Sequence, residues 1–324
     1  MLFYVIKFST DKAHTPYFKQ FNLTQKGEEF MRPVKIITDS CADIGKDLRE
    51  KYDIDYARMQ TTYKDKEQWA SLDFEYYTPK ELYDIMRNGE RVFTNQVPAE
   101  EFEKVFSHYL AEGFNIVYIG CSLKLSGSVN TGEVVAKKLL ADYPDAEIYC
   151  IDSKNSCMAE GALAIRASEY VKQGMNAKEV ADRITAERKQ INMFVTVHSL
   201  DCLKRAGRVK GSAAFFGNLL GVKPIIISDV NGNNTPIKKV KGRAASLAEI
   251  VALLKEAVGD TKQERIYIAH ADCAEEAEQL REMVKKEIPC DEIYVGYIGP
   301  IVGASVGPNT LGVFGFGKEV TFEG

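Results

Sequence analysis

The sequence predicts an α/β protein of two domains: a doubly wound, mostly parallel sheet, followed by a second α/β domain with a mixed sheet. The length of 324 residues exceeds the ~250–300 residues at which single hydrophobic cores usually stop growing. Three successive segments have the order apolar strand, polar loop and helix, which is typical of parallel sheets covered by helices. Beyond residue 190, Asn231-Gly232 between two apolar runs indicates a hairpin, and hence antiparallel pairing.

Residues 1–32 lack hydrophobic periodicity and are predicted to be an N-terminal extension, and the N-terminal domain is placed at 33–190. Its three strands are expected at Val34–Ile37, Asn115–Cys121 and Ala146–Ile151. The helices after them are expected with Ile44, Leu48 and Tyr52 on one face, up to Leu140, and near Glu160–Val171. Residues 55–93 are irregular. A helix is expected after Pro98, capped by Thr94 or Asn95, and another from Asn176 to about Gln190.

The C-terminal domain is placed at 191–324 and begins with a predicted strand at Met193–Val197. Further strands are expected at Pro224–Ser228, Thr235–Val240, Arg265–His270 and Glu292–Tyr297, and helices at Ser246–Val258 and Cys273–Glu287. Other features are a basic turn at Lys204–Arg208, an apolar segment at Ala213–Val222 and a glycine-rich apolar run at 299–317.

The composition argues against several protein classes. The net charge is 42 − 46 = −4, too mild for a nucleic-acid binder, and no apolar run approaches the ~18 residues of a membrane span. The first residues lack the features of a signal peptide. Seven cysteines without a CxxC pair predict buried free thiols in a reducing cytoplasm. Four scattered histidines offer no zinc spacing, so no metal site is expected.

Hydroxyl side chains gather at the predicted strand-to-helix junctions. They are Thr38 and Ser40, Thr94 with Asn95, Ser122, Ser126 and Ser128, and Ser153 and Ser156. Ligands of doubly wound folds bind at such junctions, where helix N-termini attract carboxylate or phosphate. Ordinary helix capping explains the same residues. Ser126 is expected to donate a hydrogen bond rather than to act as a nucleophile, because the chain has no GxSxG elbow.

Other candidate groups have structural explanations that the sequence favours. Asp39 and Asp152 follow strands and are expected in Asx turns rather than at a metal or ribose. His198 and His270 end strands and are expected to be structural or capping residues. Gly312–Lys318 resembles a P-loop, but no helix can follow it so near the C-terminus.

Two features of the sequence have both a structural and a functional explanation. Residues 201–243 hold nine basic and two acidic residues, which form either a solvated face or an anion site at Arg208 with a docking surface for an acidic or phosphate-bearing partner. The glycine-rich apolar segments 215–222 and 298–308 indicate either tight packing or, beside a polar pocket, an apolar slot for an amphipathic acid.

Seven motifs taken in order resemble the DegV family over about residues 34–322. They are Ile37-Thr38-Asp39-Ser40, Thr94-Asn95-Gln96 with Glu100-Glu101-Phe102, Leu125-Ser126-Gly127-Ser128, Ile151-Asp152-Ser153, Leu203–Arg208, Val222-Lys223-Pro224-Ile225 and Ile298–Gly303. The resemblance implies a bacterial, non-catalytic lipid-binding protein that buries a long-chain fatty acid between its domains. Such proteins present the carboxylate to a separate ATP-dependent fatty acid kinase subunit, which makes an acyl phosphate for phospholipid synthesis.

The resemblance also implies site residues. Those for carboxylate binding are Thr94, Asn95, Ser126, Gly127, Arg208 and Ser305, and those for kinase docking are Lys239, Lys241 and Arg243. Ser305 stands where the family often has a histidine, and a serine donates a hydrogen bond without carrying positive charge. No cofactor is expected, nor any nucleic-acid or integral membrane partner. The alternatives are a small-molecule phosphotransferase of dihydroxyacetone-kinase-like architecture, which needs a nucleotide site or a covalent histidine, and a regulatory docking module.

Overall fold

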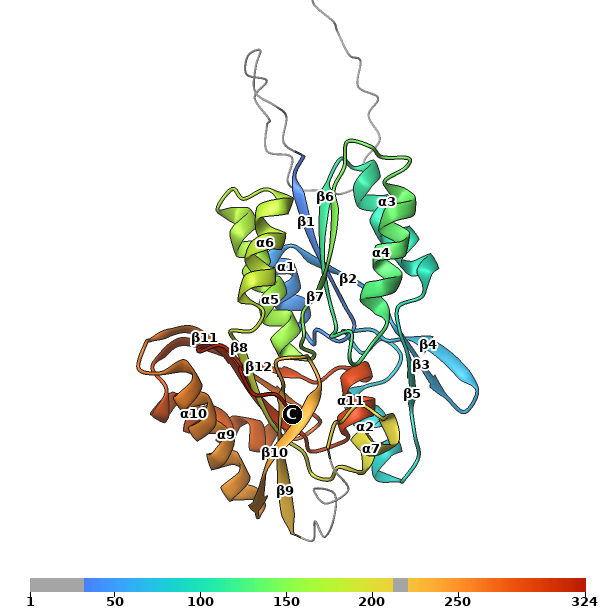
Figure 1. Ribbon diagram of the computed structural model, residues 1–324. Coiled ribbons are helices and arrows are strands. Elements are labelled where there is room, and N and C mark those ends of the chain that lie inside the picture. Colours follow the sequence, from blue (N-terminus) through green and yellow to red (C-terminus); the bar gives the residue numbers. More distant parts are fainter. Residues whose placement is uncertain (1–31, 212–220) are drawn as a thin grey trace, which may run out of the picture. The chain divides into compact units, whose positions relative to one another are not determined.

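A parallel sheet of four strands, in the order β2-β1-β6-β7, forms the first layer of the computed structural model, which describes residues 32–211 and 221–324. The strands are β1 (Val34–Asp39), β2 (Ile54–Ala57), β6 (Asn115–Gly120) and β7 (Ile148–Asp152) (Figure 1). Every residue of β6 is buried, which agrees with the continuous apolar run from which a central parallel strand was predicted.

Helices cover both faces of this sheet. Helices α3 (Ala99–Ala111) and α4 (Ser128–Leu139) lie on one face, and α5 (Met158–Lys172) and α6 (Ala177–Glu187) lie on the other (Figure 1). Asn176 begins α6 in a capping box with Glu179, as expected. The predicted cap of α3 is wrong. Its N-cap is Pro98, without a side-chain hydrogen bond, because Thr94 and Asn95 belong to a strand.

Residues 55–93 contain structure that the sequence did not reveal. Strand β3 (Gln60–Tyr63) pairs antiparallel with both β4 (Lys66–Trp69) and β5 (Phe93–Asn95). Helix α1 (Lys46–Tyr52) precedes this sheet, and α2 (Pro79–Arg87) lies between β4 and β5. These strands have three or four residues each, too few for a clear alternation, and the β3–β4 turn has Lys64 and Asp65 in the left-handed region rather than Asn-Gly.

A mixed sheet of six strands forms the second layer, in the order β10-β9-β8-β13-β11-β12. The strands are β8 (Ile191–Thr196), β9 (Val222–Ser228), β10 (Asn234–Lys241), β11 (Gln263–His270), β12 (Cys290–Tyr297) and β13 (Leu311–Phe316). Only β11 and β12 pair in parallel. The predicted β9–β10 hairpin is confirmed, and Asp229 accepts hydrogen bonds from the backbone N–H groups of Asn231 and Asn233.

One expectation for this second half is wrong, and one segment contains elements that the sequence did not predict. The predicted basic turn at 204–208 is mostly a short helix, α7 (Asp201–Ala206), which ends at Gly207 with φ 69°. The glycine-rich run at 299–317 divides into α11 (Pro300–Val306) and β13, whose mixture of small and apolar residues hid both elements. The predicted apolar segment 213–222 lies outside the described residues except for its last two positions.

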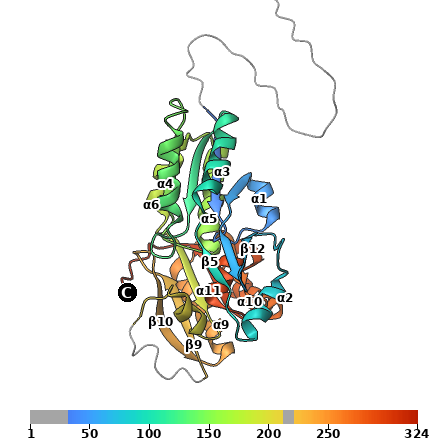
Figure 2. The ribbon, with the colours of Figure 1, turned by 90° about the vertical axis from the view of Figure 1, so that its right-hand side faces the viewer.

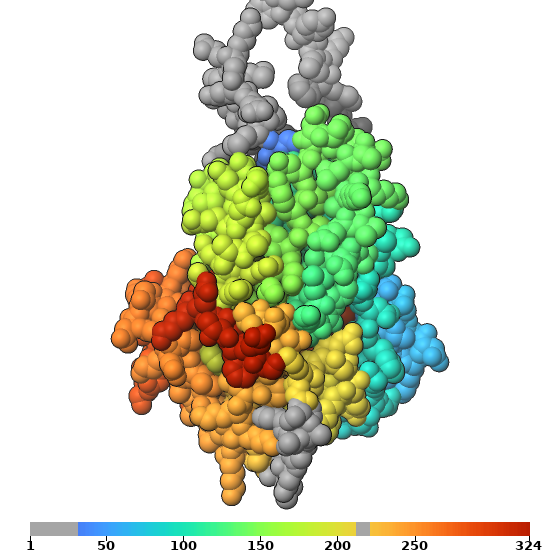
Figure 3. All heavy atoms as spheres, in the orientation of Figure 1, coloured from blue at the N-terminus to red at the C-terminus, as the bar shows by residue number. Residues whose placement is uncertain are grey.

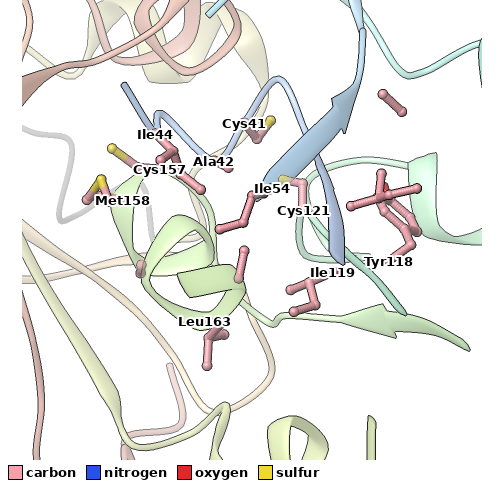
Figure 4. Packing of buried hydrophobic residues seen from close by; sticks show 14 of the residues in the cluster. Cys41, Ala42, Ile44, Ile54, Tyr118, Ile119, Cys121, Cys157, Met158 and Leu163 are labelled. Carbon is pink, nitrogen blue, oxygen red and sulfur yellow. The ribbon is translucent and has the colours of Figure 1, made fainter. Parts of the chain in front are cut away.

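Helix α5 lies between the two sheets, whereas α9 (Arg243–Val258) and α10 (Ala274–Glu287) cover the opposite face of the six-stranded sheet (Figures 1 and 2). Because α5 packs against β1 on one side and β8 on the other, most of its residues are buried. Gly161 permits this close approach, since a Cβ there would lie 2.5 Å from the carbonyl oxygen of Ala42. The shared core includes Ile44, Tyr118 and Leu163 (Figure 4).

Hydrogen bonds also join the two layers within the unit formed by residues 32–324. The Tyr83 hydroxyl donates to Ile298 O at 2.7 Å, and the Arg265 guanidinium donates to the Tyr52 hydroxyl at 2.7 Å. The C-terminal segment, red in Figure 3, lies against the β9–β10 hairpin, where Val230 N donates to Phe322 O. The predicted boundary near residue 190 falls between α6 and β8 and stays a prediction.

Candidate functional site

Several hydroxyls at the junctions of the first sheet are used inside the fold. Thr38 donates to Ile119 O at 2.9 Å, and Ser40 donates to Ala70 O at 2.7 Å. Ser153 donates to Asn155 O at 3.1 Å, and Ser122 donates to Gly232 O at 2.7 Å. These four residues are fully buried. Their hydroxyls therefore satisfy backbone carbonyls of the fold, which is the structural explanation that the sequence left open.

A cavity of about 300 Å³ lies between the carboxyl-terminal edge of the first sheet and one end of the second. Its wall includes all six residues that the resemblance assigned to carboxylate binding, namely Thr94, Asn95, Ser126, Gly127, Arg208 and Ser305. Gln96, which was not assigned, also lines it. The rest of the wall comes from the beginning of α5, from β8 and β9, and from α7 and α11. The volume is at the lower end of the ~300–1,000 Å³ typical of ligand sites.

Strand β5 supplies one polar side of the cavity. Thr94 is half-buried, and within the described part of the chain its hydroxyl has no hydrogen-bond partner. Asn95 is exposed and its amide donates to a Glu67 carboxylate oxygen at 3.5 Å, across the three-stranded sheet. Thr94 can therefore donate its hydroxyl hydrogen to a ligand without losing an internal hydrogen bond.

The loop between β6 and α4 supplies the facing polar side. The Ser126 hydroxyl lies 2.9 Å from the Ser128 hydroxyl, at the beginning of α4. Gly127 lies so close to Gln96 that a Cβ at position 127 would be 2.2 Å from Gln96 Oε1. This contact brings the loop with Ser126 against the segment that follows Thr94.

Arg208, which follows helix α7, lies on the other side of this polar region. Its Nε donates to Leu125 O at 3.1 Å and its Nη1 donates to Ala206 O at 2.7 Å. The side chain is exposed, so its positive charge faces solvent beside the Ser126 loop. Ser305, on α11, is half-buried, and its nearest acceptor is Ile301 O at 3.5 Å, a long contact that leaves its hydroxyl largely available.

Most of the remaining wall is apolar and rich in sulfur. Its apolar and sulfur-bearing residues are Cys41, Met59, Cys121, Leu125, Cys157, Met193, Val195, Leu203, Ile226, Ile298, Ile301, Val302 and Val306, whereas Ser156, Asn234 and Thr310 are polar. Three of these cysteines line the cavity from different elements: Cys41 follows β1, Cys121 follows β6, and Cys157 is the N-cap of α5 (Figure 4). Burial and neighbouring carboxyl groups raise the pKa of the Cys157 thiol well above its usual value. The thiol is therefore a neutral, polarisable part of the cavity wall.

The arrangement fits a ligand with an anionic, acceptor-only head and an apolar tail. Neither His198 nor His270 lines the cavity, and the His270 ring accepts a hydrogen bond from Cys273 N, a structural contact within the loop before α10. Among residues 32–211 and 221–324, no group of three or more His, Cys, Asp and Glu side chains is arranged to hold a metal ion. No helix in the same ranges is long and apolar enough to cross a bilayer.

Comparison with known proteins identifies the family. The model described as "Uncharacterised protein, DegV family" matches residues 33–318. A DegV domain-containing protein of Clostridium perfringens is 34% identical over 287 residues, which are 89% of this chain and 98% of the relative. The chain belongs to the DegV family.

Solved structures agree with this DegV fold. A DegV lipid-binding protein of Thermotoga maritima is 26% identical, with a TM-score of 0.78 over 89% of this chain and 100% of that chain. DegV of Bacillus subtilis, described as a fatty acid binding protein, is also 26% identical, with a TM-score of 0.77 over the same shares of the two chains. The α/β architecture with a parallel and a mixed sheet is thereby confirmed.

Three buried carboxyl groups of this DegV protein lie close to the cysteines that line the cavity. Asp39 forms the expected Asx turn, accepting from Cys41 N at 2.9 Å, and also accepts from the Tyr118 hydroxyl at 2.7 Å. Glu160 accepts from Thr38, and burial together with the charge of Asp39 raises its pKa well above the usual value. Asp43 accepts from Gly299 N at 2.8 Å, and burial raises its pKa to about 7. The sequence did not single out Asp43 or Glu160.

The three predicted docking residues of this DegV protein differ in their surroundings. Lys239 and Lys241 are exposed on the edge strand β10. The Arg243 guanidinium forms two 2.9 Å hydrogen bonds with the Glu276 carboxylate and donates to Asn309 O at 2.7 Å. Arg243 therefore joins α9 to α10 and to the turn before β13.

Part of the cavity wall in this DegV protein was missed from sequence. Met193 and Val195 of β8 and Ile226 of β9 line it, although their apolar runs predicted ordinary core strands. Asn234 also lines it, while its amide donates to Arg208 O at 3.1 Å. No sequence signal separates these residues from the core, because a strand that borders a cavity carries the same apolar side chains as one that borders a helix.

Proposed function

We propose that the protein binds a long-chain fatty acid in this cavity, with the carboxylate beside Thr94, Ser126 and Arg208. The observation that carries the proposal is that one cavity combines these polar groups with a wall that is mostly aliphatic and rich in sulfur. A carboxylate only accepts hydrogen bonds, which matches two hydroxyls able to donate and a guanidinium. The descriptions of the T. maritima and B. subtilis relatives as lipid and fatty acid binding proteins support it.

The two parts of the ligand contribute differently. Burial of each CH₂ group stabilises the complex by about 0.8 kcal/mol, so the apolar wall supplies most of the affinity. The hydrogen bonds to the carboxylate contribute less net free energy, because they replace hydrogen bonds to water. They fix the orientation of the acid instead, and leave its carboxylate near the exposed Arg208.

Mass spectrometry of the purified recombinant protein tests the proposal. Under native conditions we expect a mass excess equal to one long-chain fatty acid, and denaturing conditions should release that acid, which gives its length and saturation. The physical reason is that a preformed apolar cavity retains such ligands through purification. An empty protein that also fails to bind added fatty acids would overturn the proposal.

We further propose that the protein is a carrier and not itself an enzyme. A separate ATP-dependent kinase would transfer the γ-phosphoryl group of ATP to the bound carboxylate, forming an acyl phosphate for phospholipid synthesis and releasing ADP. The cavity supports this proposal, because its lining within residues 32–211 and 221–324 includes hydrogen-bond donors and thiols of raised pKa but no histidine or carboxylate. No cofactor enters the proposal. The seven free cysteines support a cytoplasmic location.

Of the three residues proposed for kinase docking, Lys239 and Lys241 have exposed side chains on β10. Charged side chains on an edge strand also prevent unwanted strand pairing, which is a structural explanation for the same residues. Lys241 lies seven residues along β10 from the cavity-lining Asn234, or roughly 20 Å at the usual strand rise. A docked kinase would therefore cover the edge of the second sheet as well as the Arg208 side of the cavity.

Charge reversal at both lysines distinguishes these explanations. We expect Lys239→Glu with Lys241→Glu to retain fatty acid binding and to slow acyl phosphate formation at least tenfold, with the fatty acid kinase subunit of the same organism and ATP, since complementary charge governs association. The control is Lys285→Glu with Lys286→Glu, an equal charge change on α10, which covers the opposite edge of the sheet. Equal rates for the two double variants would exclude docking through β10.

A further inference from the structure

Two serine hydroxyls at the beginning of α4 form a short chain of hydrogen bonds. Ser128 Oγ accepts from the backbone N–H of Val97 at 3.1 Å and lies 2.9 Å from Ser126 Oγ. Ser126 Oγ also accepts from the backbone N–H of Ser128 at 3.2 Å. Ser128 is fully buried, whereas Ser126 is half-buried on the cavity wall.

The direction of the hydrogen bond between the two hydroxyls follows from counting donors and acceptors. If Ser126 donated to Ser128, then Ser128 Oγ would accept twice and its own hydrogen would be buried without a partner among the described residues. An unsatisfied buried donor is costly. If Ser128 donates to Ser126, every group of the buried Ser128 hydroxyl is satisfied. The second arrangement is therefore the stable one.

This direction determines what Ser126 can offer a ligand. Its oxygen then accepts from both the N–H and the hydroxyl of Ser128, so both lone pairs are occupied. Its own hydrogen is left to point into the cavity. Ser126 thus becomes a hydrogen-bond donor only, which suits a carboxylate oxygen and not a donating head group.

The same turn of α4 also fixes the loop that follows Thr94. Besides the bond from Val97 N to Ser128, the Gln96 amide donates to the Thr131 hydroxyl at 2.7 Å. Among the described residues, only Ser128 forms hydrogen bonds to both this loop and Ser126 through the same side-chain oxygen. Ser128 can therefore fix the direction of the Ser126 hydroxyl on one side of the head-group region and the backbone of Val97 on the other.

We propose that Ser128 is a positioning residue for carboxylate recognition: it holds the Ser126 hydroxyl as a donor and fixes the Thr94 loop opposite. The inference rests on the proposed fatty acid binding. It predicts that Ser128, which does not line the cavity, controls the preference of the protein for an acid over a neutral ligand with the same chain.

The test compares dissociation constants for palmitic acid and hexadecanol in the wild type, Ser128→Ala and Ser128→Thr. We expect Ser128→Ala to reduce the acid-over-alcohol preference roughly tenfold, the size of a hydrogen bond to a charged group. Ser128→Thr keeps the hydroxyl and should restore the preference. In a Ser126→Ala background, Ser128→Ala should cause much less further loss, because Ser128 acts through Ser126.

Several outcomes separate this role from a structural one. The matched control is Ser246→Ala, which removes another buried hydroxyl from the first turn of a helix and should leave the preference unchanged. Equal weakening of acid and alcohol by Ser128→Ala would overturn the positioning role while leaving fatty acid binding intact. If the wild type binds neither ligand, the proposed function itself fails. If Ser128→Ala does not fold, Ser128→Cys, with a weakly bonding thiol of similar volume, gives the same comparison.

Discussion

Replacing Thr94 by Val and Ser126 by Ala together should lower the affinity for a long-chain fatty acid about a hundredfold. Each substitution removes one hydroxyl that can donate to the carboxylate, and a hydrogen bond to a charged group contributes about 1.5–3 kcal/mol. Two such losses come to roughly 3 kcal/mol or more, which is at least two factors of ten. Titration calorimetry or displacement of a fluorescent fatty acid measures the change directly.

The effect should depend on the head group of the ligand. The affinity for the matching fatty alcohol should change less than tenfold, because a neutral hydroxyl forms weaker hydrogen bonds than a carboxylate. Thr62→Val with Ser246→Ala removes the same two side-chain types outside the cavity, and this control should bind both ligands as the wild type does. Unchanged acid affinity in the Thr94/Ser126 variant would show that the carboxylate lies elsewhere.

Three of the four strands of the parallel sheet are predicted from sequence, whereas the short edge strand β2 (Ile54–Ala57) was missed, because it falls at the start of the stretch that looks irregular. β6 is an almost continuous apolar run, β1 begins with one, and polar loops follow both strands. Helix α1 buries Leu48 and Tyr52 as expected, but it begins at Lys46, so Ile44 belongs to the loop before it and not to the helix face. The small sheet of β3, β4 and β5 leaves no comparable pattern. Its pairing joins residues 60–63 to 93–95, a long-range contact that no local periodicity encodes.

The polar side of the candidate site is also visible in the sequence, whereas its apolar side is not. Hydroxyls at strand ends mark Thr94 and Ser126, and both line the cavity. Hydroxyls at the neighbouring junctions, such as Ser40, satisfy backbone carbonyls instead. The hydroxyls that line the cavity and those that bond backbone carbonyls look alike in the sequence. Which of them meets a carbonyl oxygen depends on tertiary structure.

The basic residues show a second limit of reasoning from sequence. Arg243 belongs to a run of positive charge, and the run alone predicts an exposed face. In the structure Glu276, more than thirty residues away, pairs with it across two helices. The charge pattern of a sequence includes only residues that are close along the chain, whereas this ion pair joins helices that are brought together by the fold.

Asp43 should make the protein less stable as the pH rises, and Asp43→Asn should remove much of this dependence. The carboxyl group is 3% exposed, and one oxygen has no hydrogen-bond partner among the described residues. Burial raises its pKa from 3.8 to about 7, although hydrogen bonds from Cys157 and Gly299 oppose the shift. Between these two values the folded state holds a proton that the unfolded state has lost, so stability decreases with increasing pH.

The expected size follows from the shift. About three pKa units correspond to at most about 4 kcal/mol, gained by the folded state below the unfolded pKa and lost by about pH 7. Asparagine keeps the oxygen that accepts from Gly299 N and tolerates the φ of 51° at this position. It does not ionise, so the variant should gain stability relative to the wild type between pH 4 and pH 8.

Urea unfolding at a series of pH values measures this difference. Asp39 and Glu160 also have raised pKa values, so the variant should lose only the part of the decline that Asp43 causes and should retain a decline of the same sign. The control is Asp65→Asn, an exposed aspartate with a similar φ of 61°, which should follow the wild type. Parallel curves for Asp43→Asn and the wild type would mean that Asp43 is already ionised in the fold. In that case the hydrogen bond from Gly299 N would be to a charged group. The contact between the loops that follow β1 and β12 would then contain a buried carboxylate at neutral pH.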